Sequence, residues 1–587
     1  MLNLRNLIWI RRFSSVNSYA LRTHTCGELS LKNEGEKVKL MGWLAYKRMN
    51  KFLVLRDSYG MVQVTVPANQ YEDLPYESVV QVEGIVRSRG DHANPNMKTG
   101  EIEVDALNME VLNRSESNLP LLPNEDVNEK TRLRYRYLDI RGDKMQKSLR
   151  VRSTLVHEMR RFLIEQRHFV DVETPTLFRR TPGGAAEFLV PSSAPNLGLC
   201  YSLPQSPQQF KQLLMVGGID RYFQIARCYR DEGSKGDRQP EFTQVDLELS
   251  FTNQEEVMRL VEDLICSSWP EHLKDLQPTG PFPHLSYEDA MKLYGSDKPD
   301  MRIPWKIQDA TSQLGFLKGE KGGLNWRAKL IVCKDHKKVL SGSFRKEAKR
   351  LLEVNDKCSA FDMYSTDKKQ WFKQINNENI MEDFDIGTDD LVIFAWGEEE
   401  NVGWTLGQLR NYVAEKSGLR KARKITFHWI VDFPLFTVEN EKLVSTHHPF
   451  TAPIPEHELM LNESENRNSI KGQHYDLVIN GVEMGGGSIR IHDPKQQELV
   501  LDILGEKSSE MAHLLKALSY GAPPHGGFAL GLDRYVAFLV GEGDPTVPVR
   551  EVIAFPKTKE GKDLMSLAPA PPSEADCNRY GFRMFKE

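Results

Sequence analysis

Cysteine is scarce in this sequence, and cysteine pairs at metal-binding spacing are absent. Seven cysteines are scattered over 587 residues without a CxxC motif, which argues against a disulfide framework and against a cysteine-based zinc site. We therefore expect buried thiols in a reducing compartment.

Long apolar runs are missing too. No stretch approaches the roughly 20 uncharged residues that a membrane-spanning helix needs, so we expect no membrane partner.

An excess of positive charge is also lacking. Lysine and arginine number 77 against 82 acidic residues, which gives a net charge of −5. Proteins that coat nucleic acid indiscriminately are usually basic throughout, so any nucleic-acid partner must be bound by local patches and specific contacts. Two common nucleotide-binding patterns, the GxxxxGK[ST] loop and the strand–GxGxxG–helix unit, do not occur. An ATP site would need another construction.

What is present is the composition of a large folded protein. Forty per cent of the residues are hydrophobic, 9% are aromatic and 27% are charged, as in ordinary globular proteins. The length is several times that of a typical domain of about 100–150 residues. We therefore expect two to four domains.

The first 24 residues differ from the rest of the chain. They hold four arginines and three serines, and no acidic residue precedes Glu28. An arginine-rich, serine-bearing and acid-free start is typical of an organellar transit peptide, which we predict for residues 1–24. A frayed basic terminus is the alternative.

The remaining chain divides by pattern. Five short alternating segments within residues 25–115 predict a small β-barrel of the OB type, although periodicity does not exclude an SH3-like barrel. A polar, proline-bearing stretch then predicts a hinge, and apolar residues at helical spacing predict a helix over 147–168. A basic and an acidic block near 301–425 indicate an inserted domain. We therefore divide the chain into residues 1–24, 25–115, 116–146, 147–300, 301–425 and 426–587.

Three polar, glycine-bearing stretches have the residue types that bind ligands. The first is a loop between two predicted strands, with Arg230 at its entry and Asp246 at its exit. In the second, Asp476 and Glu483 lie seven residues apart on adjoining extended chain, so both carboxylates can converge on one cation. Glycines follow, and they let a backbone approach a ligand closely. In the third, a glycine-rich strand leads into a helix with Arg534 near its start, which is a plausible anion site.

In this order the stretches resemble the motifs of class II aminoacyl-tRNA synthetases of the bacterial or mitochondrial aspartyl type. VETP at 172–175 resembles motif 1, YRDE…RQPEFTQ at 229–244 resembles motif 2, and GLDR at 531–534 resembles motif 3. The resemblance covers nearly everything after residue 24, and the class I hallmarks HIGH and KMSKS are absent. It implies an α+β fold: an antiparallel sheet flanked by helices, an N-terminal OB-fold barrel that binds the anticodon, and an inserted α/β domain.

The resemblance also implies a reaction and its partners. L-aspartate and ATP give aspartyl-adenylate, and the aspartyl group then passes to the 3′ end of tRNA-Asp. The nucleophile is a carboxylate that is ionised at pH 7, so no general base is needed. Positioning and charge neutralisation around phosphorus should supply the catalysis. The implied cofactor is Mg²⁺, the implied assembly is a homodimer through motif 1, and the implied location is the mitochondrial matrix.

Site residues follow from the motif positions. By resemblance, Arg230 bridges the substrate carboxylate and the α-phosphate, and Arg534 holds the far end of the triphosphate. The implied ATP contacts are Arg230, Glu232, Gln239, Glu483, Gly531, Leu532, Asp533 and Arg534. The implied aspartate contacts are Ser206, Gln208, Lys211, Arg230, Asp246, His447 and Arg490. The implied Mg²⁺ ligands are Asp476 and Glu483, and the implied anticodon-binding residues are Phe52 and Gln63.

One departure from the family pattern and three rival functions remain. Relatives have TPEG where this chain has a glycine at position 183, so a substrate-side glutamate is missing, and Glu187 is a possible substitute. Lysyl- and asparaginyl-tRNA synthetases share the motifs, but a lysine pocket needs an acid where this chain offers Arg490 and Lys211. A tRNA-binding paralogue without catalysis should have lost Arg230, Glu483 or Arg534, and all three are present. The sequence leaves open whether tRNA-Asn is also charged, where the transit segment ends and what the inserted domain does.

Overall fold

The computed structural model shows two units, one up to Gln146 and one from Lys147 onward, and each is described by itself. The structure describes residues 17–49, 51–181, 185–231, 238–318, 325–353, 355, 357–365, 380–463 and 465–583. Glu232 and Gly183, both singled out in the sequence, lie outside these residues. No helix among the described residues is long and apolar enough to cross a bilayer.

The first unit is a closed five-stranded barrel with the order β1-β2-β3-β5-β4. The strands are β1 (Lys37–Arg48), β2 (Phe52–Asp57), β3 (Gly60–Thr65), β4 (Val79–Ser88) and β5 (Ile102–Asn113). They coincide with the five alternating segments of the sequence, and their inward side chains form one apolar core. β3 and β5 pair in parallel, while the other pairs are antiparallel. The predicted OB-type barrel is confirmed.

Two features of this unit concern earlier predictions. Phe52 and Gln63 lie outside the apolar core of the barrel, on neighbouring strands, and the amide of Gln63 donates to Glu103 at 2.8 Å. Arg22 pairs with Asp57 at 2.8 Å, and the backbone N–H of Thr23 donates to strand β1. Residues just before position 25 therefore fold with the barrel. The hinge contains two short helices, α2 (Glu129–Arg134) and α3 (Arg136–Asp139).

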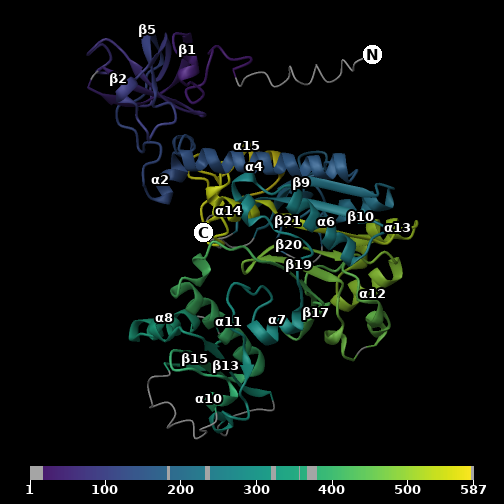
Figure 1. The fold of residues 1–587 in the computed structure, drawn as a ribbon. Coiled ribbons are helices and arrows are strands. Elements are labelled where there is room, and N and C mark those ends of the chain that lie inside the picture. Colours follow the sequence, from purple (N-terminus) through teal and green to yellow (C-terminus); the bar gives the residue numbers. More distant parts are fainter. Residues whose placement is uncertain are drawn as a thin grey trace, which may run out of the picture. The chain divides into compact units, whose positions relative to one another are not determined.

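An eight-stranded sheet forms the centre of the second unit, with the order β11-β16-β19-β20-β21-β10-β9-β6 (Figure 1). Its strands are β6 (Val170–Asp171), β9 (Arg221–Tyr229), β10 (Glu241–Ser250), β11 (His284–Ser286), β16 (Phe427–Val431), β19 (His474–Ile479), β20 (Val482–Ile489) and β21 (His525–Gly531). The six central strands are antiparallel, as predicted. The two short edge strands instead pair in parallel. Parallel pairs need long connections, and the inserted residues supply one between β11 and β16.

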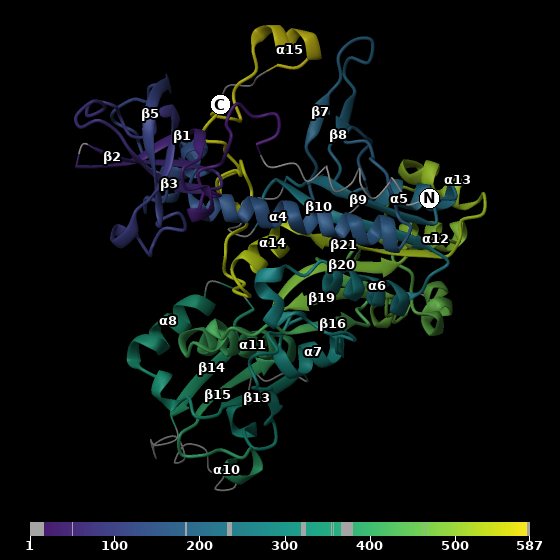
Figure 2. The same cartoon turned by 45° about the horizontal axis from the view of Figure 1, so that its top comes forward.

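Helices α4 (Asp143–Arg161), α6 (Gln254–Ser267) and α14 (Leu532–Val540) flank this sheet, and Figure 2 shows α4 lying along β9, β10 and β21. Apolar side chains of all three helices join those of the strands in the largest core cluster. A helix with one apolar stripe must bury it against another element, and the sheet provides the surface. The helix predicted over 147–168 is therefore present, and a π-helical turn (Phe162–Gln166) extends it.

The inserted domain is a four-stranded sheet with the order β12-β13-β15-β14. Its strands are β12 (Gln308–Asp309), β13 (Trp326–Cys333), β14 (Ala360–Ser365) and β15 (Leu391–Glu398). Helices α8 (Gly342–Leu352) and α11 (Glu399–Lys416) pack on one face. The predicted α/β insertion is confirmed.

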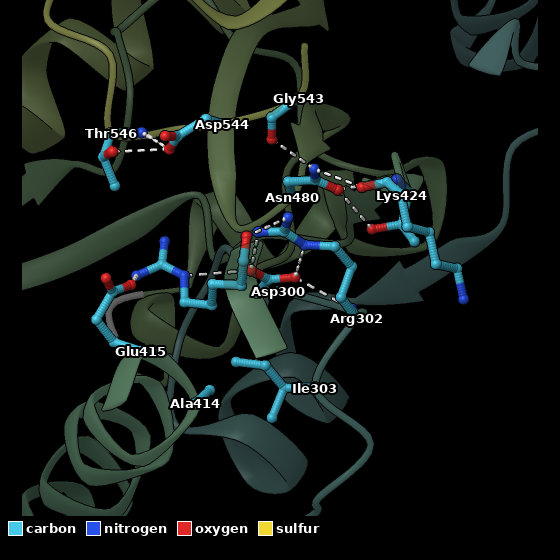
Figure 3. Close-up of polar contacts among 12 residues, drawn as sticks. Asp300, Arg302, Ile303, Ala414, Glu415, Lys424, Asn480, Gly543, Asp544 and Thr546 are labelled. Carbon is cyan, nitrogen blue, oxygen red and sulfur yellow. Dashed lines mark hydrogen bonds and ion pairs between the residues drawn. The ribbon is translucent and has the colours of Figure 1, made fainter. Parts of the chain in front are cut away.

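Polar side chains tie the two ends of the insertion to the eight-stranded sheet (Figure 3). Arg302 donates to both carboxylate oxygens of Asp300, at 2.9 and 2.7 Å, and to the carbonyl of Arg420 at 2.8 Å. Asn480, in the turn between β19 and β20, donates to the carbonyls of Lys424 and Gly543 at 3.0 and 2.9 Å. The entry and exit of the inserted domain are therefore fixed beside the β19–β20 turn.

Candidate active site

Most predicted site residues of the second unit line one cleft of about 1100 Å³. Walls come from β10, β20, the β21–α14 junction, helix α5 (Gln208–Val216) and the loop at 446–448. The cleft is lined by Ser206, Gln208, Lys211, Arg230, Gln239, Asp246, His447, Asp476, Glu483, Arg490, Gly531, Asp533 and Arg534. Residues that are up to 328 positions apart in the sequence thus share one surface, because the antiparallel sheet places their strands side by side.

The three glycines of β20 have a structural reason. A Cβ at Gly485 or Gly487 would lie 2.4 or 2.1 Å from a carbonyl oxygen of β21. A Cβ at Gly486 would lie 2.3 Å from the carboxylate of Asp476. The sequence suggested that these glycines leave room for a ligand. Contact with the neighbouring strands already excludes a side chain at all three positions.

Arg490 is completely buried at one end of the cleft and is held by three side chains. Its Nε and Nη2 donate to Glu248 at 2.9 and 3.2 Å, and its Nη1 donates to Ser488 Oγ at 2.6 Å. Nη1 also lies 2.7 Å from His448 Nε2. Four of the five guanidinium N–H groups are thereby engaged, and one on Nη2 has no partner among the described residues.

Lys211 completes a buried network of four charges. Its ammonium lies 3.2 Å from Asp246 and 3.3 Å from Glu248. Burial raises the pKa of Glu248, but the charges of Arg490 and Lys211 outweigh burial and hold that pKa below its usual value. At Asp246 burial prevails over Lys211, so its pKa is raised. The Oδ2 of Asp246 is buried and has no hydrogen-bond partner among the described residues. Asp246 is thus the carboxylate that a ligand cation would stabilise most.

His448 contacts Arg490, and His447, the implied aspartate contact, also lines the cleft. Burial, and then the charge of Arg490, lower the pKa of His448 well below its usual value, so the ring is neutral. Nε2 of this ring faces the guanidinium, which can only donate, and Nδ1 accepts from the backbone N–H of Phe450 at 3.3 Å and faces Thr451 Oγ1 at 3.4 Å. His447 instead stacks on His474, with ring centroids 3.2 Å apart. Burial lowers the pKa of His447 to about 3.

Two carboxylates crowd together further along the cleft. Asp476 accepts from His474 Nε2 at 2.8 Å, and burial raises its pKa to about 6. The pKa of Glu483 is also raised, chiefly by the negative charge of Asp476 and then by burial. A pair of carboxylates whose charges repel each other is stabilised by a hard divalent cation with oxygen ligands. The residues therefore fit Mg²⁺.

A second grouping of possible metal ligands is less suitable. His447, His474 and Asp476 bring ligand atoms within 4.8 Å of one another. The two rings are stacked with only 11° between their planes. The lone pairs of imidazole nitrogens lie in the ring plane, so parallel stacked rings do not direct them to a common point. This geometry does not form a transition-metal site.

The predicted nucleotide contacts fall into two groups. The guanidinium of Arg230 lies over the ring of Phe242 at 5.0 Å, and its Nε is buried without a partner among the described residues. Arg534 donates to the carbonyl of Glu483 at 2.6 Å. Both cations line the cleft, as does Gly531. The two arginine side chains can therefore bind an anionic ligand.

Side chains of the second group are held by the protein instead. Both ends of the Gln239 amide bond the backbone of Lys557, at 2.7 and 3.1 Å. Asp533 accepts from the backbone of Thr243 at 2.8 Å and from Arg152. Leu532 is buried in the core. Gln239 and Asp533 line the cleft and are bonded to its walls, whereas the buried side chain of Leu532 does not line it, and the ATP contacts implied for all three stay predictions.

Glu187, the possible substitute for the missing glutamate, is bonded within the protein. Its Oε1 accepts from the backbone of Thr181 and from Gln205, both at 3.2 Å. The side chain does not line the cleft. Its contacts hold the loop that precedes the cleft wall.

Comparisons with known proteins agree with this geometry. The family model for class II tRNA synthetases (D, K and N) matches residues 128–559, and the model for the OB-fold nucleic acid binding domain matches residues 38–112. The mitochondrial aspartate–tRNA ligase of Rattus norvegicus is 45% identical over 97% of this chain and 91% of its own. The human mitochondrial enzyme is 44% identical over 98% and 93%. This chain belongs to the aspartate–tRNA ligase family.

More distant relatives extend the comparison. The aspartate–tRNA(Asp/Asn) ligase of Thermotoga neapolitana is 40% identical, over 96% of this chain and 99% of its own. Among solved structures, the asparaginyl-tRNA synthetase of Pyrococcus horikoshii in complex with asparaginyl-adenylate has a TM-score of 0.57 at 19% identity, covering 91% and 98% of the two chains. The aspartyl-tRNA synthetase of Entamoeba histolytica has a TM-score of 0.53 at 18% identity, covering 90% of both. These structures confirm the class II fold.

Within this aspartate–tRNA ligase, sequence reasoning missed residues that serve the motif residues. Glu248 and Ser488 bond Arg490, and Lys557 bonds Gln239. Glu248 follows Asp246 by two positions on β10, and side chains two apart on a strand share a face. That spacing was the one signal that could have indicated Glu248.

Proposed function

We propose that this aspartate–tRNA ligase charges tRNA-Asp in the mitochondrial matrix, that Mg²⁺ bound by Asp476 and Glu483 accompanies ATP, and that the enzyme is a homodimer. The observation that carries the amino-acid assignment is the buried charge network around Arg490 and Lys211. The two positive and two negative charges of this network cancel, so a ligand that pairs with both kinds of group must itself carry one positive and one negative group. L-aspartate has an anionic side chain and a cationic α-ammonium, which match both ends of the network.

The network also accounts for discrimination against related amino acids. The spare N–H of Arg490 and the ammonium of Lys211 are donors, which suit a carboxylate. The amide NH₂ of asparagine would set donor against donor, and a mismatch that leaves charged donors unpaired is worth a factor of about 10⁴. The side chain of lysine would place a cation beside two cations. The α-ammonium of aspartate fits the unpartnered oxygen of Asp246.

The chemistry of activation needs binding and charge neutralisation rather than proton transfer. An oxygen of the aspartate α-carboxylate attacks the α-phosphorus of ATP, and pyrophosphate leaves. Arg230 and Arg534 supply positive charge along the triphosphate, where charge shifts toward the leaving group. Mg²⁺, when bound, neutralises phosphate oxygens. No side chain has to remove a proton, because the nucleophile is already ionised.

The test of this function is ATP–pyrophosphate exchange with purified enzyme. We expect exchange that depends on aspartate and does not occur with lysine. Arg490→Lys should lower kcat/KM for aspartate by at least about 100-fold, because lysine keeps the charge but loses the planar fork that Glu248 and the substrate share. The KM for ATP should stay near that of the wild type.

Arg350→Lys is the matched control, since Arg350 is exposed on α8 of the inserted domain. It should behave as the wild type does. Normal aspartate activation by Arg490→Lys would show that another cation selects the substrate. Wild-type enzyme that shows no aspartate-dependent exchange would contradict the proposed function itself.

The barrel is proposed to read the anticodon through Phe52 and Gln63. Support comes from Phe52, which is half-buried outside the apolar core of the barrel, where an aromatic ring can stack on a base. Gln63, on the neighbouring strand, is buried, and its amide would exchange its bond to Glu103 for one to a base edge. Phe52→Ala should raise the KM for tRNA-Asp in aminoacylation by about 10- to 100-fold, which corresponds to about 1–3 kcal/mol of lost stacking. ATP–pyrophosphate exchange should not change. Leu107→Ala, at a 60% exposed position of β5, is the control. Equal losses in both assays would indicate a folding defect instead.

The homodimer is proposed to form through α4 and the extended chain that ends at Pro175. Apolar side chains in this region are exposed in the single chain, among them Ile164, Val170 and Leu177. Val170 lies on β6, an edge strand of the sheet, and exposed apolar edges favour association. Sedimentation at micromolar concentration should give a dimer, and Val170→Asp should shift it toward monomer. A wild-type monomer would contradict this assembly.

Import into mitochondria is proposed to depend on the N-terminal segment. Its acid-free, arginine-bearing composition supports this, as does the mitochondrial location named for the mammalian relatives. Because Arg22 and Thr23 bond the barrel, we expect the removed segment to end before Arg22. A reporter fused behind residues 1–24 should enter mitochondria, and N-terminal sequencing of the mature enzyme should locate the cut. A purely cytosolic reporter would contradict the proposal.

A further inference from the structure

Lys298 lies beside Glu483, a residue that lines the cleft, on the segment between helix α7 (Tyr287–Tyr294) and the inserted domain. Its ammonium is 3.8 Å from Glu483 and 3.6 Å from Asp297. Glu483 is an implied Mg²⁺ ligand, but neither Lys298 nor Asp297 was among the residues expected from the motifs. The side chain of Lys298 is 45% exposed, so its ammonium has room to move.

The backbone of this segment is held tightly, although the lysine side chain is not. Asp300, two positions further on, is buried and bonds Arg302 through both oxygens (Figure 3). Its carbonyl accepts from the buried Arg410 at 3.0 Å. Gly481 lies against it so closely that a Cβ there would be 2.8 Å from the Cβ of Asp300. The turn that joins β19 to β20 therefore fixes the backbone position of the segment that carries Lys298.

That turn belongs to the strands that carry Asp476 and Glu483. The same anchor thus sets the position of the lysine relative to both carboxylates. The positive charge of Lys298 lowers the pKa of Glu483 and of Asp476, while Asp297 raises both. Lys298 is therefore electrostatically coupled to the pair that we assign to Mg²⁺.

Stability does not account for this arrangement. A half-exposed ion pair contributes little to the free energy of folding. In contrast, three buried groups, Asp300, Arg302 and Arg410, are used to hold the segment in place. A lysine is a compact point charge on a flexible stem with three donors, which suits binding to phosphate oxygens that arrive with a ligand.

We propose that Lys298 is a further binding residue for the polyphosphate of ATP, and that it exchanges its contact with Glu483 for one with a phosphate oxygen. The proposal rests on the proposed function. In the free enzyme Lys298 offsets the charge of Glu483. When ATP binds with its divalent cation, the ammonium adds positive charge near the pyrophosphate that leaves, together with Arg534.

The test uses three variants of the full chain. Lys298→Gln removes the charge of the side chain and nearly keeps its length, whereas Lys298→Arg keeps the charge. Lys292→Gln, at an exposed position of helix α7, is the matched control. Equilibrium binding of ATP at saturating Mg²⁺ is measured by calorimetry, beside the KM for ATP and for aspartate in exchange. We expect Lys298→Gln to weaken ATP binding about tenfold and to leave the KM for aspartate unchanged. Lys298→Arg should recover most of the loss, and Lys292→Gln should match the wild type.

Two results would overturn the proposal. If Lys298→Gln binds ATP as tightly as Lys292→Gln does, the lysine does not contact the phosphates. A second contradicting result would be a Lys298→Gln variant that binds ATP normally at saturating Mg²⁺ but needs a lower Mg²⁺ concentration than the wild type for half-maximal ATP binding. In that case the lysine only shields the carboxylates. Thermal unfolding midpoints equal to the wild type exclude a folding defect. Loss of aspartate-dependent exchange in the wild type would instead overturn the proposed function, so the two failures are distinct.

Discussion

The structure of the active site depends on one buried pair, Arg490 with Glu248. Burying an isolated charge costs several kcal/mol, so each charge in the cleft must find a partner. Glu248 bonds the guanidinium through two oxygens and also contacts Lys211. The pair fixes the orientation of Arg490 and leaves one of its N–H groups for a ligand. A pocket closed in this way selects its ligand by charge.

The central sheet makes this arrangement possible. β10 carries Asp246 and Glu248 on one face, and Arg490 directly follows β20. β21 lies between these strands, and its Gly527 has no side chain where a Cβ would be 2.0 Å from the carboxylate of Glu248. The same sheet brings Asp476 and Glu483 together at the β19–β20 hairpin, against which the inserted domain is anchored. Amino-acid and nucleotide ends of the cleft thus share one scaffold.

Much of the fold and the motif residues could be predicted from sequence. Alternating strands revealed the barrel, and charge blocks revealed the insertion. Arg230, Asp476 and Arg534 could be predicted because their chemistry is local to short motifs. The bonds of Gln239 and Asp533 within the protein could not, because their partners, Lys557 and Arg152, are hundreds of residues away. The same holds for the glycines of β20, whose reason lies in the contacts between strands.

The central claim is that this charge network selects a carboxylate side chain. The most direct measurement is the ratio of kcat/KM for aspartate to that for asparagine in ATP–pyrophosphate exchange by the wild-type enzyme. The account predicts a ratio of about 10⁴ or more, because asparagine leaves charged donors unpaired. A ratio within about tenfold of unity would contradict the account, since a difference of one methylene group between two substrates already gives about tenfold discrimination.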